Sequence, residues 1–390
     1  MYEERFTPEH HQYRKSVREF CDREIVPHIE AFEHNELTPR SVFEKAGAAG
    51  FLGARFSEAC GGSACDFWYS VIWAEELART HCAGTAMGLL VQSDMATPVI
   101  GALGTEVHFE EFLRPALTGQ KIAALGITEP GAGSDVAAIK TTARRDGDDY
   151  IIDGSKTYIT NGTQADFITL AVKTKPDAQP NWSGISLILF PTDTPGFTVG
   201  RKLKKLGNHS SDTAELHFDG CRVPRRFLLG EENHGFIYIM RNFQGERLVG
   251  ALTAAAGARR VWERTLEYGQ QRFAFGKPIS KYQVWRHQLV DMVTELDAGQ
   301  LLAYRAADLY DRYLKDPKNA ADPTREISQA KLYCAEMAQR VVDRCLQFHG
   351  GMGYMEEYFI ARVYRDTRLI SIGGGTSEIM KEIIAKWMGI

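Results

Sequence analysis

Short β-type runs fill the middle of the chain, and segments with helical periodicity flank them on both sides. The runs SKTYIT, DFITLAVKT, GISLILF and TAELHFDG follow one another without a helical stretch between them. Several runs are separated by dipeptides that favour tight hairpin turns, namely Asp146-Gly147, Asp153-Gly154 and Asn161-Gly162. Many short strands without crossover helices predict a barrel or sandwich rather than a doubly wound sheet.

The flanking segments predict helices. Before residue 120, apolar residues such as Tyr13, Val17 and Phe20 recur at helical spacing. From about Gly235 this periodicity returns and predicts helices around 236–271, 282–315, 325–349 and 376–388. We therefore expect an α+β multidomain fold with an N-terminal helical domain, a middle β-barrel or sandwich domain and a C-terminal four-helix bundle. The expected domains are 1–120, 121–232 and 233–390.

Composition excludes several classes of protein. The formal net charge of −4 argues against a nucleic-acid binder. Seven cysteines, an odd number without a C-x-x-C pair, are typical of reduced thiols, and we expect no metal site. No apolar run approaches the roughly 20 residues that span a bilayer, so no membrane span is expected. The N-terminus lacks the apolar centre of a signal peptide. We expect a cytoplasmic bacterial protein, or a mitochondrial matrix enzyme in its mature form.

Common catalytic signatures are missing from the sequence. No G-x-G-x-x-G follows a strand and opens a helix, so a Rossmann dinucleotide site is not indicated. Gly276-Lys277 lacks the upstream glycine and the following Ser or Thr of a P-loop. There is no H-E-x-x-H and no G-x-S-x-G. The NTPase and hydrolase interpretations therefore fail.

The segment GITEPGAGSD at 126–135 is rich in glycine and hydroxyl groups. Glycines let backbone N–H groups approach a ligand closely, and Thr128 and Ser134 add hydroxyls. On physical grounds alone, a plain turn between two strands is the better explanation of this segment. Tyr158-Ile159-Thr160 follows on a predicted strand.

These residues resemble the first signature of the acyl-CoA dehydrogenase family, and QFHGGMGYMEEYFIARVYRD at 347–366 resembles the second. The resemblance implies an FAD-dependent enzyme of fatty acid β-oxidation. It assigns the flavin to a loop and a strand, through Leu125, Ile127, Thr128, Gly133, Ser134, Tyr158, Ile159 and Thr160. Tyr158 departs mildly from the Trp or Phe that is usual there.

The resemblance also implies that a neighbouring subunit completes each FAD site in a homotetramer built as a dimer of dimers. The residues assigned to the diphosphate and adenosine half are Arg272, Phe275, Gln283, Gln347, Gly350 and Gly351. Further cofactor contacts are assigned to Thr376, Ser377 and Glu378. An arginine suits a diphosphate because its planar fork matches phosphate oxygens.

The catalytic base is the point at which this chain departs from the commonest family pattern. Many members carry a glutamate just before the last helix, where this chain has Gly374 in IGGGTSEIM. Glu246 lies on a face of aromatic and small residues in the predicted helix 236–271. From the helix alone, Arg247 or Arg241 could simply neutralise it. Isovaleryl-CoA and long-chain members, however, place their base in a Glu-Arg pair at this position, which the sequence resembles.

Three other carboxylates compete for the role of base. We expect Asp135 to cap or pair locally, Glu129 to belong to the structure of the loop, and Glu378 to favour the start of the last helix. The resemblance assigns substrate contacts to Ser134, Gln244, Arg247, Gly374 and Gly375.

The expected reaction is α,β-dehydrogenation of a long-chain or branched acyl-CoA, with electrons passed to an electron-transfer flavoprotein. Segments such as QSDMATP and HSSDTAEL also resemble citronellyl-CoA dehydrogenases. Two alternatives remain open: an oxygen-reacting flavoenzyme of the same fold (an acyl-CoA oxidase or flavin monooxygenase), and a non-catalytic acyl-CoA-binding flavoprotein.

Overall fold

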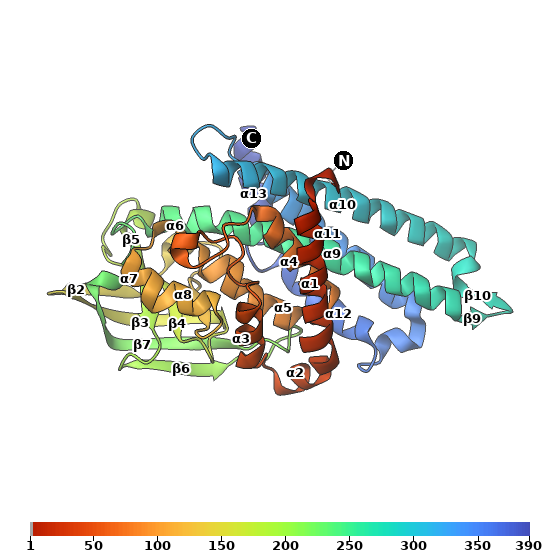
Figure 1. Ribbon diagram of the computed structural model, residues 1–390, viewed down its shortest axis with the longest axis horizontal. Coiled ribbons are helices and arrows are strands. Elements are labelled where there is room, and N and C mark those ends of the chain that lie inside the picture. Colours follow the sequence, from red (N-terminus) through yellow and green to blue (C-terminus); the bar gives the residue numbers. More distant parts are fainter. Residues whose placement is uncertain (1–2) are drawn as a thin grey trace.

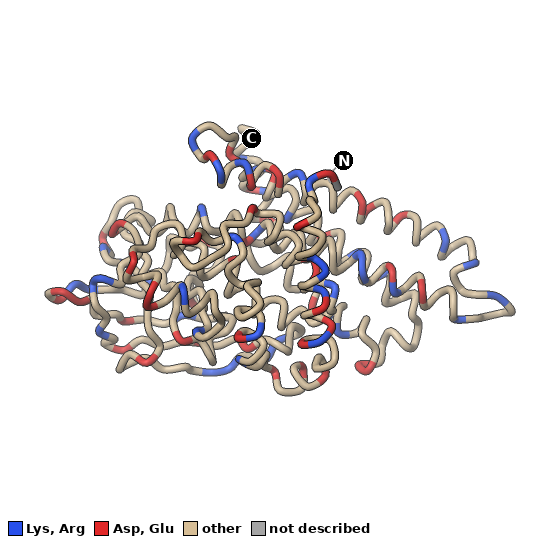
Figure 2. The backbone as a smooth tube through the Cα atoms, viewed as in Figure 1, with Lys and Arg blue, Asp and Glu red and all other residues tan. Residues whose placement is uncertain are grey.

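The computed structural model describes residues 3–390 and divides them into helices, then strands, then helices. Figure 1 shows the sheet at one end and the long C-terminal helices running away from it. The predicted fold class is therefore confirmed. In Figure 2, basic and acidic residues alternate along the helices and loops.

Helices make up the N-terminal part. They are α1 (Pro8–Glu24), α2 (Ile29–Asn35), α3 (Arg40–Ala48), α4 (Phe67–Arg79), α5 (Ala83–Leu90), α6 (Pro98–Leu103), α7 (Glu106–His108) and α8 (Arg114–Leu117). The Thr7 hydroxyl caps α1 by accepting from the His10 N–H, and Pro8 fits the first helical turn. Val17, Phe20 and Cys21 share one buried face of α1, as their spacing predicts.

One stretch is longer and more apolar than expected from the sequence, and it bears on the prediction of no membrane span. Residues Ala83–Leu103, which include a π-helical segment at Val91–Ala96, are long and apolar enough to cross a bilayer by length and composition. However, 72% of this window is buried inside the protein, as in a helix that forms part of a core.

Eight strands form one sheet in the middle part. They are β1 (Ala123–Gly126), β2 (Thr142–Asp146), β3 (Asp149–Thr160), β4 (Phe167–Lys173), β5 (Ile185–Pro191), β6 (Phe197–Lys202), β7 (Thr213–Pro224) and β8 (Leu228–Leu229). The order is β6-β7-β3-β2-β4-β5-β8, and β1 pairs parallel with β4. The two halves of the sheet are joined through the single pair Thr142–Lys173.

The predicted turns had mixed outcomes. Asp146-Gly147 lies in the tight β2–β3 hairpin, where Gly147 has a φ of +62°. The prediction of a turn at Asp153-Gly154 is wrong, because Gly154 lies inside β3 at a shift of register against β7. A Cβ on Gly154 would lie 2.5 Å from the Thr141 Oγ1, so the glycine permits a close approach within the sheet.

The C-terminal part consists of α9 (Gly235–Gln271), α10 (Gln283–Lys315), α11 (Thr324–His349), α12 (Phe359–Thr367) and α13 (Ser377–Met388). A small hairpin of β9 (Phe273–Ala274) and β10 (Lys277–Pro278) links α9 to α10 at the far end of the bundle (Figure 1). The four predicted helices begin and end within one residue of their expected limits, whereas α12 was not predicted. The apolar stripe of α11 is fully buried, from Ile327 to Phe348.

Candidate active site

Glu246 projects from α9 toward the turn that precedes α13. A Cβ built on Gly374 of that turn would lie 3.4 Å from the Glu246 Oε1. The other carboxylate oxygen, Oε2, is enclosed and has no hydrogen-bond donor among the described residues. The Glu246 side chain therefore faces the turn, but the turn donates no hydrogen bond to Oε2.

Burial raises the pKa of Glu246 to about 7, while the positive charges of Arg247 and Lys331 act in the opposite direction. Arg247 is itself buried, and its Nε has no partner within residues 3–390. Its guanidinium lies 5.7 Å from the centroid of the Phe243 ring. A carboxylate with a pKa near neutrality can accept a proton at working pH, which a solvated glutamate does poorly.

The turn at 373–376 depends on glycine. Gly374 and Gly375 have φ values of +63° and +93°, in the region that side chains disfavour. A Cβ on Gly375 would lie 2.7 Å from the Met380 Cε, so a side chain there would also collide. Thr376 then caps α13, with its hydroxyl accepting from the Ile379 N–H at 3.3 Å. Ser377 is buried, and Glu378 lies in the first helical turn as expected.

A buried ion pair on the protein side of the glycine loop at 126–135 holds the loop in place. The Lys156 ammonium lies 2.8 Å from the Glu129 Oε1 and donates to the Ile127 carbonyl at 3.0 Å. The same carboxylate accepts from the backbone N–H groups of Lys140 and Thr141. Burial alone would raise the pKa of Glu129, but Lys156 and these donors more than offset it and lower the pKa. Glu129 therefore belongs to the structure of the loop.

The side of the loop that faces away from this ion pair is open. No atom lies within 4 Å of a Cβ built on Gly131 or Gly133, and Ser134 is exposed. Ile127 is buried, while Leu125 and Thr128 are partly exposed. Asp135, which was expected to cap or pair locally, makes no capping bond to the short helix that follows.

Tyr158 presents a large aromatic surface beside this loop. It sits at a register shift in β3, has a φ of +60° and is 70% exposed. A positive φ is costly for an aromatic residue, and such strain is concentrated at functional sites. Ile159 and Thr160 resume the pairing with β7. An open glycine loop beside an outward-facing ring fits a planar aromatic cofactor.

A second group of predicted residues gathers at the opposite end of the bundle. Arg272 and Phe275 lie on the β9–β10 hairpin, and the Phe275 side chain is 97% exposed. Gln283 begins α10, and Gln347, Gly350 and Gly351 end α11, all exposed at this end. Along α9 the distance from Glu246 to Arg272 is about 40 Å, since a helix rises about 1.5 Å per residue. The structure thus separates the predicted cofactor residues into two groups within one chain.

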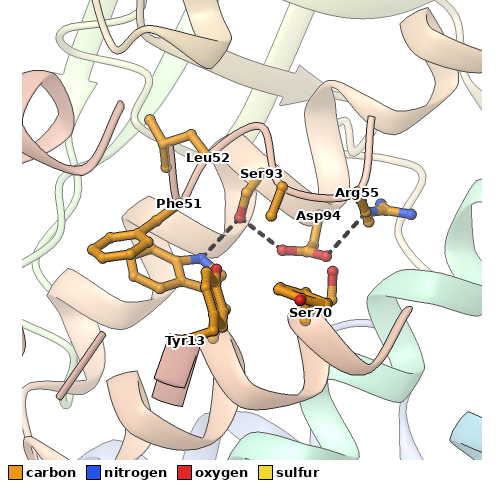
Figure 3. A pocket seen from close by; sticks show the side chains of 10 residues that line it. Tyr13, Phe51, Leu52, Arg55, Ser70, Ser93 and Asp94 are labelled. Atoms are coloured by element: carbon orange, nitrogen blue, oxygen red, sulfur yellow. Dashed lines mark hydrogen bonds and ion pairs between the residues drawn. The ribbon is translucent and has the colours of Figure 1, made fainter. Parts of the chain in front are cut away.

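Two polar residues of the apolar stretch 87–100, Gln92 and Ser93, already form hydrogen bonds inside the protein. The Gln92 amide donates to the carbonyls of Ala116 and Lys121 and accepts from the Ala123 N–H. Ser93 donates to the Asp94 Oδ2 at 2.7 Å. Figure 3 shows this pair, with Arg55, beside a cavity of about 10 Å³. A volume of this size holds about one water molecule, so the cavity is no substrate pocket.

Sequence reasoning missed one residue of the site, Lys331. It projects from α11 and donates through Nζ to the Gly375 carbonyl. The available signal was a lysine within the apolar stripe of a predicted helix, between Ala330 and Cys334. A charge at such a position is costly to bury and needs a partner.

Comparisons with known proteins cover the whole architecture. Family models match three consecutive parts of the chain: the N-terminal domain of acyl-CoA dehydrogenase over 7–120, its middle domain over 124–221 and its C-terminal domain over 233–389. The mitochondrial long-chain specific acyl-CoA dehydrogenase of Mus musculus is 39% identical over 381 residues, which cover 98% of this chain and 86% of that protein.

Solved structures agree with these matches. An acyl-CoA dehydrogenase from Geobacillus kaustophilus is 44% identical, with a TM-score of 0.92 over 98% of this chain and 99% of that one. A glutaryl-CoA dehydrogenase from Mycobacterium smegmatis in complex with FADH2 is 30% identical, with a TM-score of 0.89 over 98% of this chain and 95% of that one.

Proposed function

This chain belongs to the acyl-CoA dehydrogenase family, and on that basis we propose that it oxidises the Cα–Cβ bond of an acyl-CoA thioester to a trans-2-enoyl-CoA, with Glu246 as the base. The observation that carries this assignment is the enclosed Glu246 carboxylate, whose pKa burial raises to about 7. It faces a turn of three glycines, where the commoner family base would stand.

FAD is the cofactor that the site fits. The loop residues Leu125, Ile127, Thr128, Gly133 and Ser134 would hold it together with the strand Tyr158–Thr160 and the turn residues Thr376, Ser377 and Glu378. The open loop and the exposed Tyr158 ring support this fit. When bound, FAD supplies the acceptor for the hydride that leaves the substrate's β-carbon.

The chain's own groups act on the α-carbon. Backbone N–H groups of the turn at Gly374 and Gly375 bind the thioester oxygen and stabilise the negative charge that develops there. Glu246 takes the α-proton, whose acidity this stabilisation increases. Arg247 and Gln244 flank the base on α9, and Ser134 of the glycine loop contacts the CoA portion.

The substrate is proposed to carry a long or branched apolar acyl chain. The π-helical segment Val91–Ala96 lies against α9, to which the Asn242 amide ties it by donating to the Met95 carbonyl at 2.7 Å. Its polar residues Gln92 and Ser93 already bond elsewhere in the protein, which leaves apolar groups for an acyl chain. The likeness to a long-chain relative supports the same substrate class.

Electrons then pass to an electron-transfer flavoprotein in the cytoplasm or the mitochondrial matrix. A chain in the solved structure described as the electron transferring flavoprotein of Acidaminococcus fermentans is 32% identical to this chain, with a TM-score of 0.92. Anaerobic titration with acyl-CoAs of graded length, followed by exposure to air or to that acceptor, tests both points. Rapid reoxidation by air would favour an oxygen-reacting enzyme instead.

Replacing Glu246 by Gln tests the central assignment. The amide keeps the size of the side chain but cannot accept the proton, so flavin reduction by acyl-CoA should fall about 100- to 10,000-fold while FAD and acyl-CoA still bind. Stopped-flow absorbance of the flavin measures the rate. Glu267→Gln, on the exposed surface of the same helix, is the matched control and should reduce its flavin normally. Near-normal reduction by Glu246→Gln would show that the base lies elsewhere.

A further inference from the structure

Lys331 is a buried lysine that no carboxylate neutralises directly. The residue is 2% exposed, and no ion pair joins it to an acidic side chain anywhere in the part of the chain that the structure describes. Among the described residues, its side chain forms one hydrogen bond, from Nζ to the Gly375 carbonyl. Burying an ammonium group with one neutral partner is costly, so packing alone does not explain a lysine here.

The bond that Lys331 makes fixes the turn beside the base. Gly374 and Gly375 have no side chains to hold their backbone, and glycine has the widest conformational freedom of any residue. Holding the Gly375 carbonyl orients the peptide plane that follows it, and it limits rotation of the preceding one. That preceding peptide carries a backbone N–H proposed to bind the thioester oxygen, so its orientation matters for the reaction.

The charge of Lys331 also reaches Glu246. The charged groups that act on this carboxylate are Arg247 from its own helix and Lys331 from α11, and both favour its ionised form. The turn contributes only glycines on this side. Burial and the charge of Arg247 lower the pKa of Lys331 to about 8, although Glu246 and Glu378 act in the opposite direction, so most of the lysine is charged at pH 7.

We propose that Lys331 is a positioning residue for the reaction: it anchors the Gly374–Gly375 turn over Glu246, and its positive charge favours the ionised form of that base. This inference rests on the proposed function. It assigns a catalytic consequence to a residue that acts through the turn and the base.

Lys331→Met removes the charge and the donor at similar volume, and exchanging a buried charge for an apolar group of like size is often neutral for folding. We expect flavin reduction at pH 7 to slow about tenfold or more, and its pH midpoint to move to higher pH. Calorimetry should show weaker binding of an acyl-CoA analogue that cannot be oxidised, because the turn is no longer held. Lys331→Gln provides a second neutral variant if the methionine protein does not retain FAD.

Two further variants distinguish the effect of the Lys331 charge from the effect of its hydrogen bond to the turn. Lys331→Arg keeps the charge but displaces the donor, so its rate should fall while its pH midpoint stays near that of the wild type. Lys381→Met removes an exposed charge from the neighbouring α13 and should change neither quantity. If wild-type protein reduces its flavin and a neutral Lys331 variant matches it in rate, midpoint and analogue affinity, the inference is wrong. If wild-type protein is not reduced by any acyl-CoA, the proposed function fails instead.

Discussion

At the scale of single residues, the environment of Glu246 sets the pKa of the proposed catalytic base. Its position on an apolar helix face was predictable from the spacing of its neighbours, and its assignment as base came from the resemblance of the Glu-Arg pair. Its apolar surroundings already favoured a raised pKa, but the turn that lies beside it comes from more than a hundred residues away in the sequence and could not be placed there in advance. Lys331 was missed for the same reason, since only the folded chain brings it to Gly375.

The raised pKa predicts how the rate depends on pH. Glu246 must be ionised to accept a proton, so kcat/KM for an apolar acyl-CoA should rise with pH and reach half its plateau at about 7. An anaerobic stopped-flow series between pH 5.5 and 9, at constant ionic strength, measures this limb. A midpoint near the ordinary value for glutamate, 4.5, would mean that the carboxylate is solvated in the working enzyme.

The same group should destabilise the protein at alkaline pH. A carboxyl whose pKa is higher in the folded than in the unfolded state binds more protons when folded, so its contribution to stability falls as pH rises from about 4.5 to about 7. Glu246→Gln does not titrate and should gain up to about 3 kcal/mol relative to the wild type above pH 7. Scanning calorimetry of both holoenzymes at pH 5 and pH 8 should show Tm values that differ more at pH 8. An equal difference at both pH values would contradict this.

At the scale of elements, helix limits were well predicted because local signals set them, whereas close packing in the sheet was not. The Asp153-Gly154 pair has the composition of a turn, but Thr141 approaches Gly154 and the strand continues through it. A dipeptide cannot reveal whether the chain reverses or a neighbouring strand passes close by. The glycine loop illustrates the same limit, because its anchor Lys156 comes from a strand about thirty residues later.

Breaking that anchor should release the cofactor. Lys156→Met leaves the buried Glu129 carboxylate without its cation, which typically costs about 3–5 kcal/mol. The loop should then lose its fixed shape, and the purified protein should contain much less FAD by absorbance. The double variant Lys156→Met with Glu129→Gln removes the uncompensated charge and should recover part of the lost stability. Full FAD content in the single variant would show that the loop does not depend on this pair.

At the scale of the whole molecule, Arg272 lies about 40 Å along α9 from the proposed base Glu246. This separation between the base and the residues expected at the diphosphate supports the proposal that a neighbouring subunit completes each FAD site. The family resemblance predicted both groups, but only the structure shows that the β9–β10 hairpin lies at the end of the long helices that is farthest from the sheet (Figure 1). The exposed Phe273 and Phe275 on the hairpin are the apolar surface that such a neighbour would cover.

Mixed oligomers test this arrangement directly. Arg272→Glu puts a negative charge beside the expected diphosphate and should abolish activity by releasing FAD, while Glu246→Gln abolishes it by removing the base. When both chains are expressed together with different tags, hybrid oligomers should regain activity, because an Arg272→Glu chain keeps its base and receives an intact hairpin from its neighbour. Dehydrogenase assays on doubly purified hybrids measure this. Hybrids without activity, or a monomer that keeps its FAD, would mean that each chain binds FAD alone.

The glycine opposite Glu246 also limits the mutational routes by which a base can move between the helix and the turn. A glutamate at position 374 would place its first side-chain carbon 3.4 Å from the Glu246 Oε1. Two carboxylates in one enclosure cannot both ionise at neutral pH and would share a proton. An ancestor that gained the second carboxylate before losing the first would have kept a base at every step, although it would have worked best at higher pH. The opposite order passes through a chain with no base, which selection for activity would remove.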